Sequence, residues 1–275
     1  MPRTWTPTTT TTHQSPDSAH ADEQLRQVDV CFVMDATGSM SSYIDAARRE
    51  LKSLVQRLSA HPMKPKMAFA LVLYRDHPPQ ESTFVTQMTA LNSDSSAVQR
   101  ALDGASADGG GDGPEAVTDG LADAVNKTQW RKGAHRVIML AGDAPPHGYG
   151  DYGDAWPQGC PCGNDPVTLV ANGRDKGITT FCLGIGDDET MVSSFQRIAS
   201  AGGGVYVSLA NAASLIEQIL RLTMGEFSKV EIDRIVFAAY SPGSTVAAIA
   251  RATGLSDTVV RESLDRLRRK EMIRP

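Results

Sequence analysis

The stretch from Val28 to Met40 reads V-D-V-C-F-V-M-D-A-T-G-S-M, and it decides the fold. Its first half is an apolar, β-branched run of the kind that forms a strand buried on both faces of a parallel sheet. The run stops at Asp35, and a short polar turn leads into a helical pattern. This order predicts an open α/β sheet, in which ligands bind just beyond the carboxyl ends of the strands.

Three oxygen-bearing side chains on alternate residues fill that turn, namely Asp35, Thr37 and Ser39. One carboxylate and two hydroxyls are hard donors, which suit Mg²⁺ or Mn²⁺ better than a metal that prefers thiolates. Ser and Thr also cap helices routinely, so a helix N-cap explains the same spacing. Taken alone, the turn supports the metal site and the helix cap equally.

Length and composition allow one medium-sized domain and a small one. The 275 residues are 41% hydrophobic, which is enough for a substantial core. Residues 1–225 hold 18 basic and 25 acidic side chains, whereas residues 226–275 hold nine basic and seven acidic ones. The contrast favours two domains, but the basic excess is too small to establish nucleic-acid binding.

Cysteine usage and hydropathy indicate the compartment. Four cysteines in a chain of this length do not form a disulfide framework. No apolar run is long enough to cross a bilayer, and no signal-peptide core opens the chain. We therefore expect a cytoplasmic protein without a membrane partner.

Strand and helix patterns alternate over residues 27–225, after a Thr/Pro/Ser-rich stretch (residues 1–26) that we predict to be a disordered tail. Strands are predicted at 28–35, 66–74, 83–85, 137–141, 178–183 and 205–207. Helices are predicted at 43–58, 94–102, 115–126, 166–176, 189–199 and 213–222. The alternation predicts a Rossmann-like α/β sandwich, a mostly parallel sheet with helices on both faces. It lacks the G-x-G-x-x-G fingerprint of dinucleotide binding.

Two further carboxylates follow later strands of this sheet. Asp112 lies in the glycine-rich loop G-G-G-D-G-P-E, and Asp143 follows a buried strand. Loops at the carboxyl ends of strands converge in a doubly wound sheet. Together with Asp35, Thr37 and Ser39, these residues favour a cation site over a helix cap.

D-A-T-G-S-M resembles the D-x-[ST]-x-S signature of von Willebrand factor A domains, and L-A-G-D-A-P-P-H-G resembles the loop with that family's second metal-site aspartate. The resemblance covers most of the chain. It implies a MIDAS-type site in which Thr37 and Ser39 bind Mg²⁺ (or Mn²⁺ or Ca²⁺) directly, while Asp35 and Asp143 bind it directly or through water. The family usually has a Thr where this chain has Asp112. The extra carboxylate would hold the metal more firmly and weaken its attraction for a partner's carboxylate.

The same resemblance implies adhesion or assembly, in which an acidic residue of a protein partner fills an open metal position. The motifs Y-R-D-H-P-P-Q, G-G-D-G-P-E-A, D-A-P-P-H-G and G-C-P-C-G resemble a subgroup found linked to atypical alpha-kinases and in bacterial signalling proteins. They suggest multi-component signalling or anti-phage defence. We expect no enzyme; a metal-dependent hydrolase is the weaker alternative, because hydrolysis needs a base placed against a bound water.

Polar side chains in loops at the same edge predict a rim that binds the partner, made of Arg75, His77, His147, Cys160 and Cys162. Arg75 and His77 fit a simple turn equally well. The C-P-C pair admits a zinc site with His147, or a redox pair. Its C-x-C spacing differs from the common C-x₂-C of zinc sites, and it favours a tight loop packed over the metal face.

Residues 226–275 are predicted to form a separate helix-turn-helix unit. A helix over 232–240 is followed by an S-P-G-S break, and two amphipathic segments meet at Gly254, which allows a sharp turn. The layout resembles bacterial winged-helix regulators with little or no wing, and the recognition helix would span 257–270. The candidate DNA contacts are Thr258, Arg261, Arg266, Arg268, Arg269 and Lys270.

Three carboxylates on the same helix oppose contact with DNA phosphates, those of Asp257, Glu262 and Asp265. Protein docking is therefore slightly favoured over DNA binding. Our primary prediction is a non-enzymatic adaptor with a metal-dependent partner site and a second contact through the helix-turn-helix. The alternative is a DNA-binding transcription regulator that is controlled through the large domain.

Overall fold

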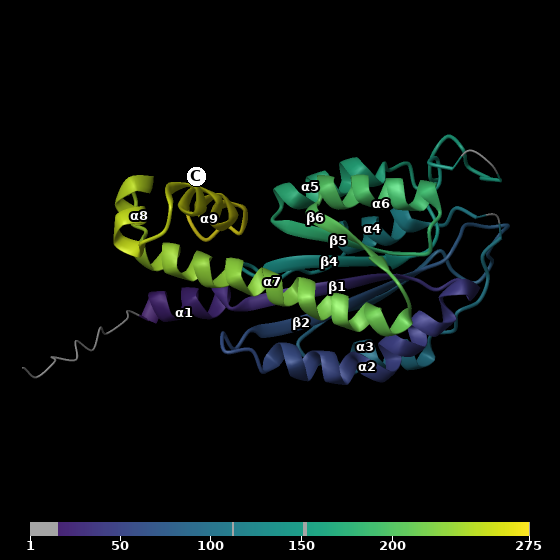
Figure 1. Cartoon of the computed structure of the whole chain (residues 1–275), viewed down its shortest axis with the longest axis horizontal. Helices are drawn as coiled ribbons and strands as arrows, with labels where there is room; N and C mark the ends of the chain where they lie inside the picture. Colours follow the sequence, from purple (N-terminus) through teal and green to yellow (C-terminus); the bar gives the residue numbers. More distant parts are fainter. Residues whose placement is uncertain (1–15, 112, 151–152, 275) are drawn as a thin grey trace, which may run out of the picture.

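The computed structural model describes residues 16–111, 113–150 and 153–274, and at its centre lies a six-stranded sheet with strand order β3-β2-β1-β4-β5-β6 (Figure 1). The strands are β1 (Gln27–Asp35), β2 (Lys66–Tyr74), β3 (Thr86–Asn92), β4 (His135–Gly142), β5 (Ile178–Ile185) and β6 (Gly203–Leu209). Neighbouring strands are parallel except β2 and β3, which are antiparallel. The predicted mostly parallel α/β sandwich is confirmed.

Helices cover both faces of the sheet (Figure 1). One face carries α2 (Ser41–Ser59), α3 (Ser96–Gly104) and α7 (Ala212–Ala239), and the other carries α4 (Val117–Asn126), α5 (Pro166–Asp175) and α6 (Glu189–Ala201). Phe32 and Met34 of β1 belong to the first core, and Cys31 and Val33 belong to the second. Because β1 is buried on both faces, its sequence is continuously apolar instead of alternating.

The polar segment before β1 is partly helical, which corrects the prediction that all of it is disordered. Helix α1 (Pro16–Leu25) precedes the strand, and Leu25 is 1% exposed in a third core that includes side chains of α7. Arg234 Nε also donates a 2.6 Å hydrogen bond to Asp22. The composition suggested disorder because it is dominated by polar residues, whereas one apolar anchor orders the helix. Residues 1–15 of the predicted tail lie outside the described residues.

The predicted domain boundary at residue 226 falls inside a continuous helix, which corrects it. α7 runs unbroken for 28 residues, although polar residues interrupt its apolar pattern. Two of these are buried with partners: Glu226 accepts a 2.7 Å hydrogen bond from His135 at the start of β4, and Asp233 binds α9 (Asp257–Arg269). Neither α7 nor any other described helix is both long and apolar enough to cross a membrane.

Two short helices follow α7 and pack on it, α8 (Val246–Thr253) and then α9. Gly254 between them has φ 74°, a left-handed conformation that glycine adopts without strain. The side chains of Thr245 and Ser256 cap the two helices. The structure thus contains the expected pair of helices about Gly254, while a relation to winged-helix regulators stays a prediction.

A buried ion-pair network fastens α9 to α7. Asp233 is 0% exposed and accepts hydrogen bonds from Ser263 Oγ at 2.8 Å, Arg266 Nε at 3.0 Å and Lys270 Nζ at 2.9 Å. Burial alone would raise the pKa of Asp233, but the adjacent Lys270 and Arg266 outweigh burial and lower it. The carboxylate is therefore ionised and serves as the counter-ion of a buried ammonium.

We expect Asp233→Ala to lower the free energy of unfolding by about 3–5 kcal/mol, because it leaves the buried ammonium of Lys270 without its partner. Urea denaturation at pH 7 measures this change. Asp265→Ala is the matched control: its carboxylate is 59% exposed and pairs with Arg268 on the surface, so the loss should stay within about 0.5 kcal/mol. Equal losses in the two variants would contradict the role assigned to the network.

Candidate metal centre at the carboxyl edge of the sheet

The winding of the chain reverses between β1 and β4, which lie side by side at the centre of the sheet. Asp35 is the last residue of β1, and Asp143 directly follows β4. Met34 and Ala141, which precede them, pair with each other in the parallel register. Open α/β sheets bind ligands at such a switch point. The fold therefore brings two of the predicted ligand loops to one place.

The glycine-rich loop after α3 lies against the same turn. Gly38 N donates a hydrogen bond to Gly109 O at 3.3 Å. Gly110 has φ 89°, and a Cβ at this position would stand 3.3 Å from Thr37 Cβ, so the loop needs a glycine to pass this close. The third predicted ligand loop thus joins the other two. Its ligand Asp112 lies outside the described residues.

The hydroxyls of the D-A-T-G-S turn do not cap the helices that follow. Thr37 precedes the short 3₁₀ helix η1 (Gly38–Met40), Met40 precedes α2, and neither position makes a side-chain capping hydrogen bond. Thr37 Oγ1 instead donates to Asp35, and Ser39 is exposed. The helix-cap alternative is therefore wrong for this turn.

Asp35 is fully buried, and its two oxygens have different surroundings. Oδ1 accepts hydrogen bonds from Thr37 N at 2.7 Å and from Thr37 Oγ1 at 2.6 Å. Oδ2 has no hydrogen-bond donor among the described residues. Burial raises the pKa of Asp35 to about 7, the hydrogen bonds from Thr37 oppose the rise, and the neighbouring Asp143 adds to it.

These residues fit a divalent cation. The buried carboxylate of Asp35 and the half-buried carboxylate of Asp143 repel each other, and a cation removes the repulsion. Asp35 Oδ2 offers a buried oxygen that no protein donor uses. Thr37 adds a hydroxyl that is 4% exposed, and Ser39 adds an exposed one on the outer side of the turn. All these donors are oxygens, which is the preference of Mg²⁺ and related hard ions.

One buried residue near this site was not anticipated from the sequence. Tyr74 ends β2, and its hydroxyl is buried without a hydrogen-bond partner among the described residues. Burial, with the charges of Asp35, Asp143 and Glu115, raises its pKa well above the usual value. A Cβ at Gly142 would collide with the hydroxyl, so this glycine leaves space for the ring. The only signal in the sequence was a polar atom at the end of an apolar run.

The predicted partner-binding rim lies mostly inside the protein, which corrects that expectation. The exposed fraction is 4% for Arg75, 8% for His77, 1% for His147 and 6% for Cys160, and only Cys162 is half-buried. The sequence showed that these side chains follow strand ends, but it could not show that other loops cover them. Their roles must therefore come from the contacts that they make.

Arg75 fastens the loops around the oxygen site. Its guanidinium donates to Ala36 O at 3.2 Å and to Ser106 O at 2.7 Å, and it pairs with the buried carboxylate of Glu81 at 3.1 Å. One side chain thereby joins the D-A-T-G-S turn to the loop after α3. Arg75 therefore holds in position the loops around the candidate metal centre.

His147 lies between two carboxylates. Its Nε2 is 2.8 Å from Asp76 Oδ1, and its Nδ1 is 2.8 Å from Asp154 Oδ1. Burial opposes protonation of His147, but the hydrogen bonds to both carboxylates outweigh burial and raise its pKa. Both ring nitrogens of His147 are thus engaged by carboxylates, so it is not free to form the zinc site with the C-P-C pair that the sequence had left open. His77 and Cys160 instead meet at Asp119.

The candidate DNA contacts on α9 divide between surface and interior. Thr258, Arg261, Arg268 and Arg269 are exposed. Lys270 is 2% exposed and bound to α7, so the expectation that it contacts DNA from the surface is wrong. The pattern of α9 did not reveal this, because Lys270 lies next to exposed arginines in the sequence.

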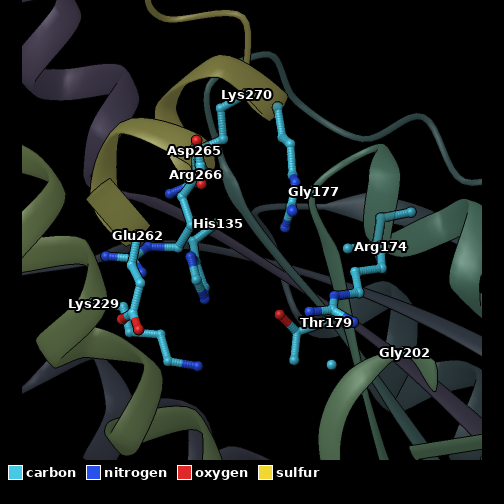
Figure 2. Close-up of a pocket in the computed structure, with 13 residues that line it drawn as sticks. His135, Arg174, Gly177, Thr179, Gly202, Lys229, Glu262, Asp265, Arg266 and Lys270 are labelled. Carbon is cyan, nitrogen blue, oxygen red and sulfur yellow. The ribbon is translucent and has the colours of Figure 1, made fainter. Parts of the chain in front are cut away.

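Arg266 also faces inward, with 19% of its side chain exposed in its ion pair to α7. Together with Arg269 and Lys270 it lines a cavity of about 350 Å³ between α9 and the amino ends of β4 and β5, where His135 and Gly177 form the opposite wall (Figure 2). Of the four basic candidates from Arg266 to Lys270, three therefore line this cavity, and only Arg268 does not.

The mostly parallel sheet, covered by helices on both faces and with Asp35 and Asp143 at its switch point, defines a Rossmann-like domain of the α/β class. A family model of the von Willebrand factor type A domain matches residues 29–221. The chain belongs to this family.

Known proteins share parts of this domain. The alpha-protein kinase vwkA of Dictyostelium discoideum is 31% identical over 141 residues, which are 50% of this chain and 22% of that protein. This chain therefore matches about a fifth of the length of that relative. The structure of the conserved hypothetical protein BatB from Bacteroides thetaiotaomicron has a TM-score of 0.50 at 18% identity, covering 74% of this chain and 98% of that one.

A second similar structure is proximal thread matrix protein 1 from the mussel byssus, solved with a zinc-occupied MIDAS motif. Its TM-score is 0.51 at 19% identity, over 72% of this chain and 46% of that chain. At such identities these likenesses show the shared fold.

We expect Asp35→Asn to stabilise the metal-free protein at pH 8 and to flatten its pH dependence. The pKa of Asp35 is about 7 in the folded protein and 3.8 ordinarily, so proton uptake favours the fold. The contribution of Asp35 to the free energy of unfolding is full below about pH 3.8 and is lost as the pH rises through 7. Asparagine carries no charge and avoids the loss.

Urea denaturation in EDTA between pH 6 and 8.5 measures this difference. Asp175→Asn, which removes an exposed carboxylate at the end of α5, is the control and should keep the wild-type slope. If Asp35→Asn kept that slope as well, Asp35 would not be the group that titrates.

Proposed function

We propose that this chain is a metal-dependent adaptor, which recruits a protein partner through the carboxyl edge of its sheet. The observation that carries this proposal is the buried carboxylate of Asp35, which has one oxygen without a donor among the described residues and Asp143 as its neighbour. Such an arrangement is unfavourable for a protein that never binds a cation. Membership of the von Willebrand factor type A family supports an interaction role.

Mg²⁺ is the cation that we propose. Asp35, Thr37, Ser39 and Asp143 would hold it, with Asp112 as a further carboxylate. Oxygen donors alone favour a hard ion, and Mg²⁺ usually keeps one or more positions for water or for a ligand from outside. The zinc-occupied motif of the mussel protein supports a divalent cation at this position, without fixing its identity.

An acidic side chain of the partner would complete the coordination. Gly38 and Ser39 are exposed, so the outer side of the turn is open to a second protein. Asp112 would add negative charge, which strengthens metal binding and weakens the attraction for an incoming carboxylate. We therefore expect firm metal binding and reversible recruitment of the partner.

The helices α8 and α9 would provide a second contact. Arg261, Arg268 and Arg269 are exposed on α9, but Asp257, Glu262 and Asp265 are exposed on the same helix. This mixed charge suits a protein partner better than a DNA backbone. We place the adaptor in the cytoplasm, in a multi-component signalling or defence system, and we assign it no catalytic activity.

Isothermal titration of Mg²⁺ and Mn²⁺ into the metal-free chain tests the cation site. We expect saturable binding by the wild type and a loss of at least about tenfold in affinity for Asp35→Ala, which removes a ligand. Asp175→Ala, which removes an exposed carboxylate at the opposite edge of the sheet, should bind as the wild type does. Equally weak binding by all three proteins would refute the site.

Affinity capture from native extract, with Mg²⁺ or with EDTA, tests recruitment. The partner should be retained only with Mg²⁺, and Asp35→Ala should lose it in both conditions. A partner that stays bound in EDTA, or that Asp35→Ala retains, would contradict recruitment through the metal.

A further inference from the structure

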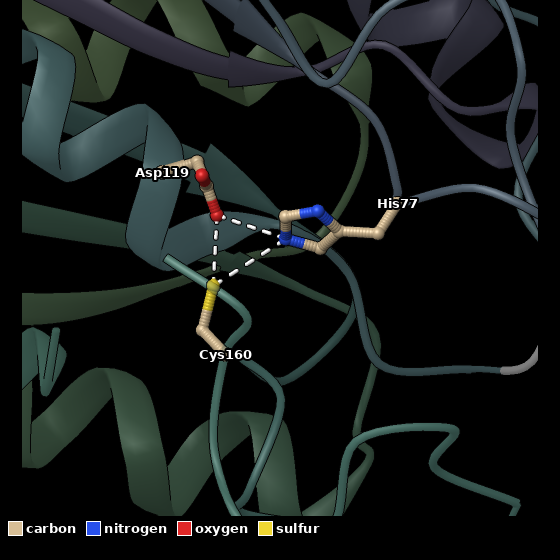
Figure 3. A group of neighbouring side chains, drawn as sticks. All are labelled: His77, Asp119 and Cys160. Carbon is tan, nitrogen blue, oxygen red and sulfur yellow. Dashed lines mark hydrogen bonds and ion pairs between the residues drawn. The ribbon is translucent and has the colours of Figure 1, made fainter. Parts of the chain in front are cut away.

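Three metal-ligating side chains converge at a second place (Figure 3). His77 follows β2, Asp119 lies in the first turn of α4, and Cys160 lies in the loop between β4 and α5. His77 Nε2 is 3.0 Å from Asp119 Oδ2 and 3.4 Å from Cys160 Sγ, and this sulfur is 2.8 Å from the same carboxylate oxygen. One nitrogen, one oxygen and one sulfur from three separate segments thus form a small triangle.

This arrangement differs from a nucleophilic relay of cysteine, histidine and aspartate. In a relay, the histidine contacts the nucleophile through one ring nitrogen and the carboxylate through the other. Here Cys160 and Asp119 both approach the same ring nitrogen of His77 (Figure 3). One nitrogen offers either one proton or one lone pair, so it cannot serve both groups in a relay. Three donors that point to one centre are instead the arrangement of a metal site.

The identity of the donors selects the metal. A thiolate, an imidazole and a carboxylate are ligands that tetrahedral Zn²⁺ takes in proteins. With metal–ligand distances of about 2.0–2.3 Å, the ligand atoms of such a site lie about 3.3–3.8 Å apart. The separations of 2.8 to 3.4 Å between the three atoms would each have to widen by less than about 1 Å.

Cys162, in the same C-P-C turn as Cys160, is the candidate for the fourth ligand. Only one residue separates it from Cys160, and its backbone N–H donates to Cys160 Sγ at 3.5 Å. In metal sites, hydrogen bonds from groups that do not bind the ion orient the atoms that do. Cys162 is half-buried, and its Sγ lies 3.6 Å from Asn164 Nδ2. This sulfur lies outside the triangle of His77, Asp119 and Cys160, so the side chain of Cys162 would turn toward the ion to bind it. Neither cysteine forms a disulfide.

The surroundings hold these ligands in place. The backbone N–H of His77 donates to Asp76 at 2.6 Å, and Asp76 also binds His147. The ring of Trp156 packs edge-on against both imidazoles, with ring centroids 5.1 Å from His77 and 4.7 Å from His147. Gly148 and Gly159 approach so closely that a Cβ on Gly148 would meet the backbone of Gly159, which closes the base of the cysteine loop.

We propose that His77, Asp119, Cys160 and Cys162 bind one Zn²⁺ in a closed, tetrahedral, structural site. Four protein ligands leave no position for water or substrate, so the site has no catalytic role. The ion fastens the cysteine loop to α4 and to the end of β2. It shares no ligand with the Asp35 centre, and the two sites differ in their donors: sulfur and nitrogen in one, oxygen alone in the other.

Metal analysis of the full chain, purified without chelator, tests this proposal. We expect about one Zn²⁺ per chain, as a closed structural site requires. Cys160→Ser and Asp119→Asn should lower the zinc affinity by at least about tenfold. Asp35→Ala should retain its zinc, which separates this site from the oxygen site. Cys182→Ala is the matched control, because it removes a buried cysteine of the second core.

Replacement of the metal by Co²⁺ provides a test in the wild-type chain that does not depend on the folding of any variant. We expect the visible bands of tetrahedral Co²⁺ and a thiolate charge-transfer band in the near ultraviolet. Cys162→Ser should halve the charge-transfer intensity, and an unchanged intensity would overturn the assignment of Cys162. A wild-type chain that takes up Co²⁺ without a thiolate band, or takes up none, would overturn the site as a whole.

Discussion

The buried carboxylate of Asp35, with the half-buried Asp143 as its neighbour, is the constraint on which the rest of this structure depends. Asp35 and Asp143 come from adjacent central strands, because the sheet winds outward in both directions from β1 and β4. Keeping Asp35 ionised at a pKa of about 7 costs on the order of 4 kcal/mol relative to an ordinary carboxyl. Two fully buried aliphatic side chains contribute a similar amount, and β1 alone buries more than two on its faces. The core can therefore support a site that is unfavourable in itself.

Four consecutive residues at the end of β2 connect the two candidate metal centres. Tyr74 lies close to the oxygen site, and Arg75 fastens the loops around it. Asp76 holds His147, and His77 contacts Asp119 and Cys160. The supports of the two candidate centres thus come from one continuous stretch of backbone.

The sequence predicted the sheet and the position of its ligand edge well, because apolar strands that are buried on both faces leave a clear pattern. The sequence also predicted that Asp35, Thr37 and Asp143 lie at one edge of the sheet, because the carboxyl ends of parallel strands meet at the same edge. It failed where burial depends on distant partners. Lys270 looked like a surface base and is buried against Asp233, and His77 belongs to a cluster with Asp119, a residue that no motif marked. Sequence spacing within one segment cannot reveal such contacts between segments.

The unbroken helix α7 connects the carboxyl edge of the sheet to the C-terminal helices. It begins at the carboxyl edge of the sheet, passes the amino edge where Glu226 meets His135, and continues to α8 and α9 (Figure 1). Its 28 residues span about 42 Å. The helix therefore holds α8 and α9 at a fixed distance from the carboxyl edge of the sheet, so the two ends of the molecule cannot move independently without bending α7.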